Sequence, residues 1–169
     1  MKGKNDAGDS VSGLNWTPAT SLTEWSKERL DNVRRLIIET TGEAYEVERL
    51  RDLPLDGGFG RWVLSDGGVD YGILWVMRLS SDCARVLAFC VDEELQGKGN
   101  GADGWRHFAT AAKAHGIRKV QLEVRQDNAA AIRLYHRRGL RPKGYISGFY
   151  RGHDGWLMQG RLLAEASSQ

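Results

Sequence analysis

A run of apolar residues without alternation, followed by a glycine-rich segment and a helical pattern, constrains the fold of this chain most. Residues 86–91 are all apolar, which is typical of a central strand covered on both faces. The segment 96–102 contains three glycines, and apolar side chains follow it at helical spacing. Backbone N–H groups in such a loop converge on an anion, and a helix N-terminus adds partial positive charge. The sequence therefore predicts a strand–loop–helix unit that binds phosphate groups.

The other segments predict strands and helices in an order typical of a mixed α/β domain. Ser21–Glu24 resembles a capping box that begins a helix ending at Gly42, and residues 45–53 predict a second short helix. Strands are expected at 61–64, 71–79, 86–91, 120–124, 145–150 and 156–162. Helices are expected from the glycine loop to Gly116, and from Asp127 or Asn128 to Gly139. This order predicts a mostly antiparallel sheet with one parallel crossover at its centre.

Length and composition fit one globular domain. The chain has 169 residues, 41% hydrophobic and 27% charged. We expect a flexible leader over residues 1–15, a single domain over 16–164 and a tail over 165–169. The apolar runs are too short to span a membrane, and the polar N-terminus is not a secretory signal, so a cytoplasmic protein is expected. Two cysteines and four scattered histidines predict no metal site.

Charge is distributed unevenly along the chain. The total is only +2, which argues against a generally basic nucleic-acid coat. Residues 96–161, however, carry 13 Lys and Arg against four Asp and Glu. This basic half indicates either an anionic ligand or a solvated basic face.

The glycine loop fits two templates. Gly99-x-Gly101-x-x-Gly104 satisfies a dinucleotide fingerprint, and the acidic Glu123 follows about twenty residues on. Against this reading, several residues separate the strand from the first glycine, and a hairpin meander precedes it instead of parallel βαβ units. Gly104 also falls inside the expected helix with no obvious close contact. The second template is Gln96-x-x-Gly99-x-Gly101.

This second pattern and its surroundings resemble the GNAT superfamily of N-acetyltransferases. Residues 86–102 resemble the central strand and acetyl-CoA loop of that family. Residues 122–125, 128–135 and 138–140 resemble its second half, most closely in the branch of ribosomal-protein alanine and protein N-terminal acetyltransferases. The resemblance covers under half of the chain, and Asn100 and Gly104 depart from the usual pattern. It implies a mostly antiparallel six- or seven-stranded sheet, about four flanking helices and a central splayed strand pair.

The resemblance also implies a cofactor, an acceptor and site residues. It implies acetyl-CoA as the cofactor, Glu123 as the general base and Tyr135 as the general acid. The implied cofactor contacts are Phe89, Cys90, Val91, Gln96, Gly97, Lys98, Gly99, Asn100, Gly101, Ala102, Asn128 and Tyr135. Phe149 and Tyr150 resemble the tyrosines that hold a peptide N-terminus. The residues alone favour a surface strand position for Glu123 and a core position for Tyr135 over catalytic roles. For Phe149, cross-strand packing explains the residue at least as well as an acceptor contact does.

The predicted function is transfer of acetyl from acetyl-CoA to a primary amine by direct attack. The acceptor is either a protein or peptide N-terminal α-amine or a small-molecule amine. Two alternatives remain: a nicotinamide-dependent oxidoreductase using the dinucleotide fingerprint, and a non-catalytic CoA-binding module. No nucleic-acid partner is expected, because the basic half lacks interleaved aromatic residues and a helix-turn-helix pairing. A monomer or a homodimer is expected.

Overall fold

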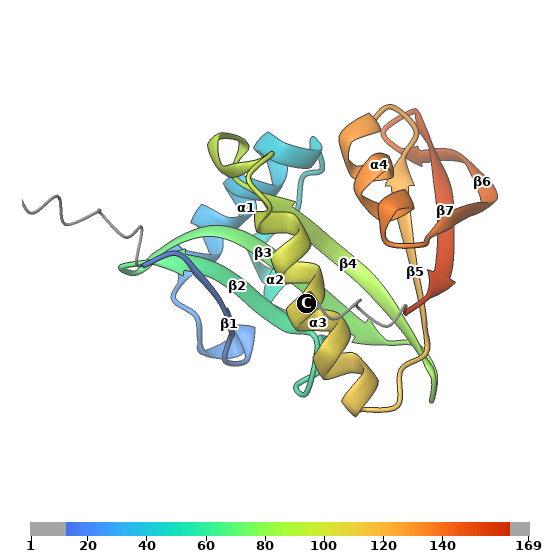
Figure 1. Ribbon diagram of the computed structural model, residues 1–169. Coiled ribbons are helices and arrows are strands. Elements are labelled where there is room, and N and C mark those ends of the chain that lie inside the picture. The colour runs from blue at the N-terminus through green and yellow to red at the C-terminus, as the bar shows by residue number, and fades with distance from the viewer. Residues whose placement is uncertain (1–12, 163–169) are drawn as a thin grey trace, which may run out of the picture.

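The computed structural model describes residues 13–162, and within them seven strands form one sheet (Figure 1). The sheet order is β1 (Asn15–Pro18), β2 (Arg61–Asp66), β3 (Val69–Arg78), β4 (Cys83–Val91), β5 (Lys119–Arg125), β7 (His153–Arg161) and β6 (Arg141–Tyr150). Only β4 and β5 are parallel, as the predicted crossover requires. Most of the expected leader (residues 1–12) and the expected tail at 165–169 lie outside the described residues.

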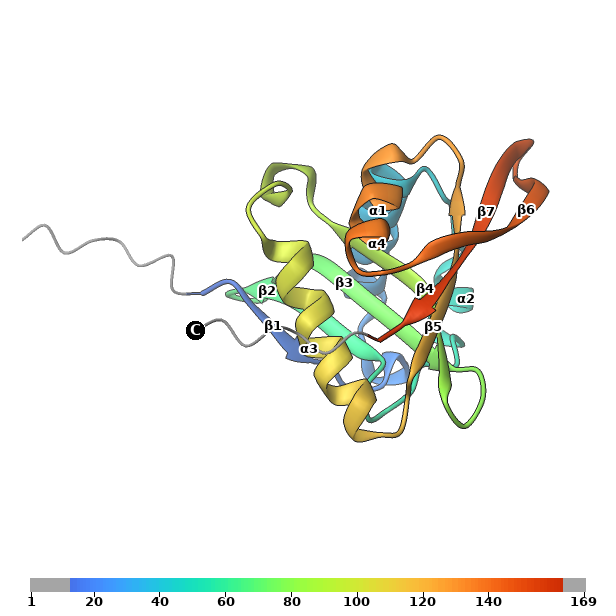
Figure 2. The ribbon, with the colours of Figure 1, turned by 45° about the vertical axis from the view of Figure 1, so that its right-hand side comes forward.

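Helices cover both faces of the sheet (Figure 2). The α-helices are α1 (Lys27–Thr41), α2 (Val47–Arg51), α3 (Asn100–Ala114) and α4 (Ala129–Arg137), with short 3-10 helices at Leu22–Glu24 and Glu93–Leu95. On one face, α1 and α2 bury Leu30, Ile37 and Leu50 against Ile73 and Trp75. On the other face, α3 and α4 form a second core with strand residues from both halves of the sheet. The predicted mixed α/β sheet with about four helices is therefore confirmed.

The central strands β4 and β5 separate after a short stretch of pairing. They pair only between Cys83–Val86 and Lys119–Leu122. Beyond this ladder β4 continues to Val91 and β5 to Arg125, and the two strands diverge (Figures 1 and 2). The sheet therefore opens at its centre, beside the end of β4 that leads into the glycine loop.

The start of the first helix differs from the predicted capping box. Ser21 makes no side-chain capping bond and precedes the 3-10 helix Leu22–Glu24. The chain then extends at Trp25, and Ser26 caps α1 by accepting a hydrogen bond from the Arg29 N–H at 3.1 Å. Trp25 is therefore outside α1, where it packs edge-on against Trp75. The predicted helix end at Gly42 is confirmed, and its φ of +74° is the left-handed conformation that glycine permits.

Strand β1 was missed by the sequence analysis, and it explains Gly104. Trp16 on β1 is buried against α3, where its indole N–H donates to the Asn100 carbonyl at 2.8 Å. A Cβ on Gly104 would lie 2.6 Å from the Trp16 ring. The expectation that Gly104 has no close contact is therefore wrong. This glycine lets α3 approach β1.

Because of this contact, we expect Gly104→Ala to destabilise the protein, the opposite of the usual effect of Gly→Ala inside a helix. Gly→Ala inside a helix normally stabilises by about 1 kcal/mol. At Gly104 the added methyl group displaces a hydrogen-bonded Trp16, so we expect Gly104→Ala to destabilise by about 1–3 kcal/mol. Gly101→Ala on the same helix is the control, because its Cβ would meet no atom closer than 3.8 Å. Urea unfolding compares the two variants, and a Gly104→Ala protein as stable as wild type would contradict the prediction.

Candidate active site

The glycine loop between β4 and α3 has the geometry of an anion site. Gly97 and Gly99 have φ of +72° and +85°, and a Cβ at either would meet no atom within 4 Å. Gly99 is the N-cap of α3 and supplies no side-chain cap, so the first N–H groups of the helix are available to a ligand. The helix dipole adds positive charge at the same point. The arrangement therefore fits the phosphate groups of a nucleotide cofactor.

Two polar residues predicted to contact the cofactor brace the loop with their side chains. The Gln96 amide donates to the Val91 carbonyl at 2.9 Å. The Asn100 amide donates to the Leu95 carbonyl at 3.0 Å. These bonds hold the loop in shape from within. The Gln96 backbone N–H also donates to the Glu93 carbonyl at 3.3 Å, so Gln96 shapes the loop. Asn100, as the first residue of α3, presents its backbone N–H at the helix N-terminus.

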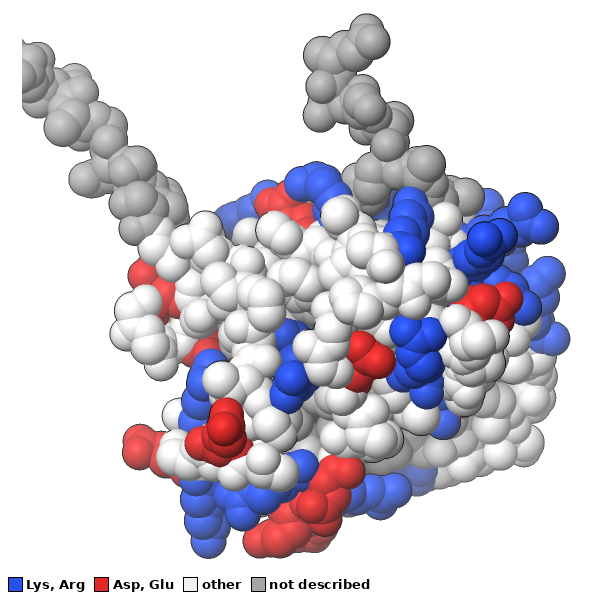
Figure 3. All heavy atoms as spheres, turned by 90° about the horizontal axis from the view of Figure 1, so that it is seen from below, with Lys and Arg blue, Asp and Glu red and all other residues white. Residues whose placement is uncertain are grey.

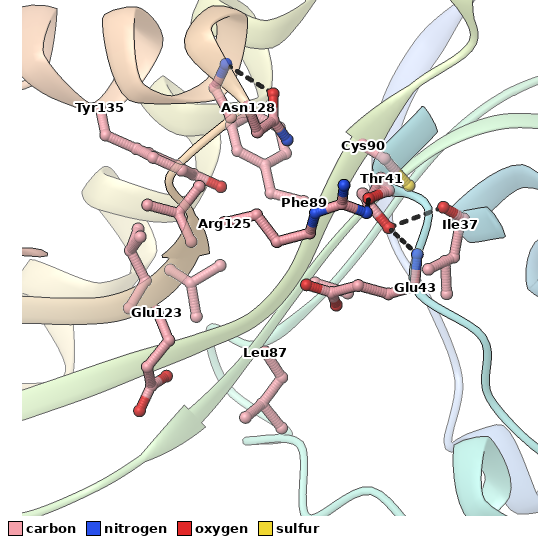
Figure 4. Close-up of a pocket in the computed structure, with 15 residues that line it drawn as sticks. Ile37, Thr41, Glu43, Leu87, Phe89, Cys90, Glu123, Arg125, Asn128 and Tyr135 are labelled. Atoms are coloured by element: carbon pink, nitrogen blue, oxygen red, sulfur yellow. Dashed lines mark hydrogen bonds between the residues drawn. The ribbon is translucent and has the colours of Figure 1, made fainter. Parts of the chain in front are cut away.

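Tyr135 projects from α4 into the opening between β4 and β5 (Figure 4). Its ring is buried, with centroids 6.3 Å from Phe89 and 6.1 Å from Trp105. Burial raises the pKa of Tyr135, with smaller contributions from Cys90 and Glu43, so the hydroxyl remains a donor at physiological pH. Asn128 caps α4 by accepting from the Ala131 N–H at 3.2 Å. The predicted cap at Asn128 is therefore confirmed.

The end of β4 supplies different side chains to the two faces of the sheet. Phe89 packs with Trp16, Trp105 and Tyr135 on the α3 side. Cys90 lies in the core beneath α1, and burial raises the pKa of its thiol to about 12 despite a hydrogen bond with Thr40. A thiol held protonated in this way is a poor nucleophile. Cys90 therefore serves packing and its backbone position on β4.

Glu123 lies beside the opening but is held in an ion pair. The Arg85 guanidinium on β4 binds both carboxylate oxygens of Glu123 on β5, at 3.0 and 3.1 Å. In Figure 4 its carboxylate points away from Tyr135. This ion pair was not anticipated from the sequence, and it engages the oxygens that a general base would need.

A second carboxylate, Glu43, was missed by the sequence analysis. It lies in the loop between α1 and α2 and lines the same pocket as Glu123 and Tyr135 (Figure 4). Burial raises the pKa of Glu43, although the Tyr45 hydroxyl donates to it at 3.1 Å and Arg125 lies nearby. Glu43 immediately follows the helix-ending Gly42, a pattern that carries no functional signal. Only the fold brings this loop against β5.

The predicted acceptor residues line the far side of the opening from the glycine loop. Phe149 shares a pocket with Glu43, Tyr45, Arg85 and Glu123. The Tyr150 hydroxyl accepts a hydrogen bond from the Ala44 N–H and so joins the β6–β7 hairpin to the α1–α2 loop. The site thus has two sides, with the glycine loop on one and two carboxylates among aromatic residues on the other.

The fold argues against the dinucleotide reading of the glycine loop. That reading requires a sheet of parallel strands, whereas this sheet has a single parallel pair. Gly104, the third glycine of the fingerprint, packs against Trp16 on β1.

Within residues 13–162, no helix is long and apolar enough to cross a membrane.

Solved structures with the same fold include acetyltransferases. Ard1 from Thermoplasma volcanium is 24% identical, with a TM-score of 0.78 over 90% of this chain and 99% of that chain. The ribosomal-protein-S18-alanine N-acetyltransferase from Escherichia coli is 18% identical, with a TM-score of 0.72 over 92% and 98%. Naa50 from Arabidopsis thaliana, in complex with the bisubstrate analogue CoA-Ac-MVNAL, is 14% identical, with a TM-score of 0.69 over 87% and 97%.

A search of curated protein sequences found no match. The family model described as acetyltransferase (GNAT) family matches residues 20–140, which contain the glycine loop, the splayed strands and Tyr135. At these identities the structural likeness establishes the fold, and the family match covers more than half of the sequence. The chain therefore belongs to the GNAT acetyltransferase family.

Proposed function

We propose that this protein transfers acetyl from acetyl-CoA to the α-amine of a peptide or protein N-terminus. The observation that carries the proposal is the opening between β4 and β5. At one end of the opening lies the glycine loop, where no side chain caps the N-terminus of α3. Tyr135, Glu43 and Glu123 line the opening itself. The loop N–H groups suit the pyrophosphate, and the unpaired edge of β4 at Phe89–Val91 suits an extended arm carrying amide groups. Structural neighbours whose names include CoA compounds support the same cofactor.

The reaction needs a neutral amine, a stabilised oxyanion and a protonated leaving group. The amine nitrogen attacks the thioester carbonyl carbon, and the C–S bond then breaks. The Tyr135 hydroxyl donates its proton to the departing sulfur, and a carboxylate on the acceptor side takes the proton from nitrogen. Of the two carboxylates, Glu43 fits the role of base better, because Arg85 occupies Glu123 and because burial raises the pKa of Glu43 toward that of an amine. Glu123 then orients the acceptor.

An α-amine fits this site better than a lysine side chain. Its pKa is about 8 against about 10.4, so making it neutral at pH 7 costs about 3 kcal/mol less. The acceptor pocket is walled by Tyr45, Leu53, Leu87 and Phe149, which suit an apolar first residue. The Naa50 neighbour, whose bisubstrate analogue joins CoA to a peptide, supports a peptide acceptor.

A thermal-shift series tests the cofactor first. Acetyl-CoA or CoA at about 100 times its Kd adds about 2.7 kcal/mol to the stability of the native state. For a domain of this size the unfolding midpoint rises by about 5–10 °C. NAD and NADP serve as controls. A shift with these nucleotides and none with acetyl-CoA or CoA would contradict the proposal.

Release of CoA thiol then tests the acceptor. We expect turnover with peptides that have a free α-amine and an apolar first residue. The matched control is the same peptide with its N-terminus blocked and an internal lysine retained. Turnover with small amines but not with peptides would replace the peptide acceptor by a small-molecule one.

A further inference from the structure

A basic hollow lies at the end of β5 remote from the glycine loop. It is lined by Cys83, Lys119, Val120, Gln121, Gly139, Arg141, Lys143, Gln159, Gly160 and Arg161. Four of these residues are cationic and none is acidic. Figure 3 shows Lys and Arg gathering on the side of the molecule that β5, β6 and β7 form. The hollow is separate from the cofactor loop, because it lies at the amino ends of the parallel strands.

The cations of this hollow have few acidic partners among the described residues. Lys119 on β5 and Arg161 on β7 are directly opposite partners in the antiparallel ladder. Like charges in such a pair are destabilising. Lys119 forms a long, exposed ion pair with Asp82 at 3.9 Å, and the Arg141 guanidinium donates to the His136 and Leu140 carbonyls. Among residues 13–162, Arg141, Lys143 and Arg161 form no ion pair. Four cations concentrated in this way favour an anionic ligand.

The hollow lies on the same sheet face as the acceptor pocket. Lys119, Gln121 and Glu123 alternate with the buried residues of β5, so all three side chains project from one face. Gln121 and Gln159 hydrogen-bond across β5 and β7 at 2.9 Å and continue this polar track. From Glu123 to Lys119 the strand rises by about 13 Å, a length that about four extended peptide residues span.

We propose that the basic hollow binds acidic side chains of the acceptor peptide, at about positions four to seven counted from the acetylated residue as position one. This inference rests on the proposed peptide acetyltransferase function and names the acceptor class more narrowly. The amine enters beside Glu43 and Glu123, and the following residues run along β5 toward Lys119, Lys143 and Arg161. Their carboxylates neutralise the like charges on β5 and β7. The enzyme thereby selects acceptors with an acidic segment behind an apolar N-terminus.

Paired peptides test this selection. Both have the same first three residues, and positions four to seven are Asp and Glu in one and Asn and Gln in the other. We expect the acidic peptide to have a KM lower by about fivefold, as two or three screened ion pairs provide. The advantage should shrink as salt rises from about 0.05 to 0.5 M, because exposed charges are screened.

A charge-matched pair of variants assigns the effect to the hollow. Lys119→Gln/Lys143→Gln/Arg161→Gln removes three exposed cations from it and should abolish the preference without changing turnover of the neutral peptide. Lys27→Gln/Arg35→Gln/Arg106→Gln removes three exposed cations from α1 and α3 and should retain the preference. Equal kcat/KM for both peptides with wild type, or an unchanged preference in the first variant, would overturn this inference alone. Acetylation of neither peptide would overturn the proposed function itself.

Discussion

Replacing Tyr135 by Phe is expected to lower kcat by about 100-fold or more while leaving the Kd for acetyl-CoA unchanged. The substitution removes one oxygen from a ring that is packed between Phe89 and Trp105. Because burial raises the pKa of Tyr135, the oxygen carries its proton throughout the working pH range and stabilises the departing thiolate by donating it. The Phe ring keeps the packing, so the loss falls on the chemical step. Steady-state release of CoA thiol measures kcat, and calorimetric titration measures the Kd.

Phe89→Leu is the comparison for Tyr135→Phe. It disturbs the same aromatic cluster but removes no proton donor. If the role of Tyr135 is only structural, both variants should lose stability and activity together. If Tyr135 is the acid, its Phe variant keeps the wild-type unfolding midpoint and loses turnover. Wild-type turnover in Tyr135→Phe would exclude the residue as the acid.

Replacing Glu43 by Gln should lower kcat/KM by about 100-fold and remove the acidic limb of the pH profile. A base works only when deprotonated, so activity is lost as pH falls through its pKa. Burial raises the pKa of Glu43 above its ordinary value of 4.5, so wild type loses this activity at a higher pH than an exposed carboxylate would. A second rise of kcat/KM near pH 8 reflects deprotonation of the acceptor α-amine and should remain in the variant. The measurement is kcat/KM from pH 5 to 9.

Stability gives an independent check on Glu43. Between 4.5 and the raised pKa the native state binds more protons than the unfolded state, so the stability contributed by this group falls as pH rises. Gln removes the buried charge and can still accept the Tyr45 hydrogen bond. The variant should therefore be as stable as wild type at pH 7, or more so, despite its low activity. Glu123→Gln is the comparison, since it breaks the ion pair with Arg85. A larger loss of kcat/KM and of the acidic limb in Glu123→Gln than in Glu43→Gln would make Glu123 the base.

The sequence predicted those parts of the fold whose signal is local. The apolar run of β4, the loop glycines and the Asn128 cap are each readable within a few residues, and each is where the pattern placed it. β1 was missed because four residues ending in Pro18 have no periodicity of their own. Its place is fixed by pairing with β2 and by the fit of Trp16 on Gly104.

The candidate site was predicted unevenly for the same reason. Glu123 and Tyr135 stand in recognisable motifs, but their surroundings do not. The Arg85 ion pair joins residues 38 positions apart, and Glu43 depends on how a loop packs across the sheet. Such contacts follow from tertiary structure, so neither the restraint on Glu123 nor the burial of Glu43 was visible beforehand.

The short β4–β5 ladder also affects how the two halves of the sheet can move relative to each other. Only four residue pairs join the two strands, so few backbone hydrogen bonds connect the two halves of the sheet, which also share the core beneath α3 and α4. A rotation of one half of the sheet against the other would change the width of the opening between β4 and β5, where Phe89 and Tyr135 pack together. A ligand bound in this opening would contact both strands and restrict this rotation. The amide hydrogens of β4 and β5 should therefore exchange more slowly when the ligand is bound.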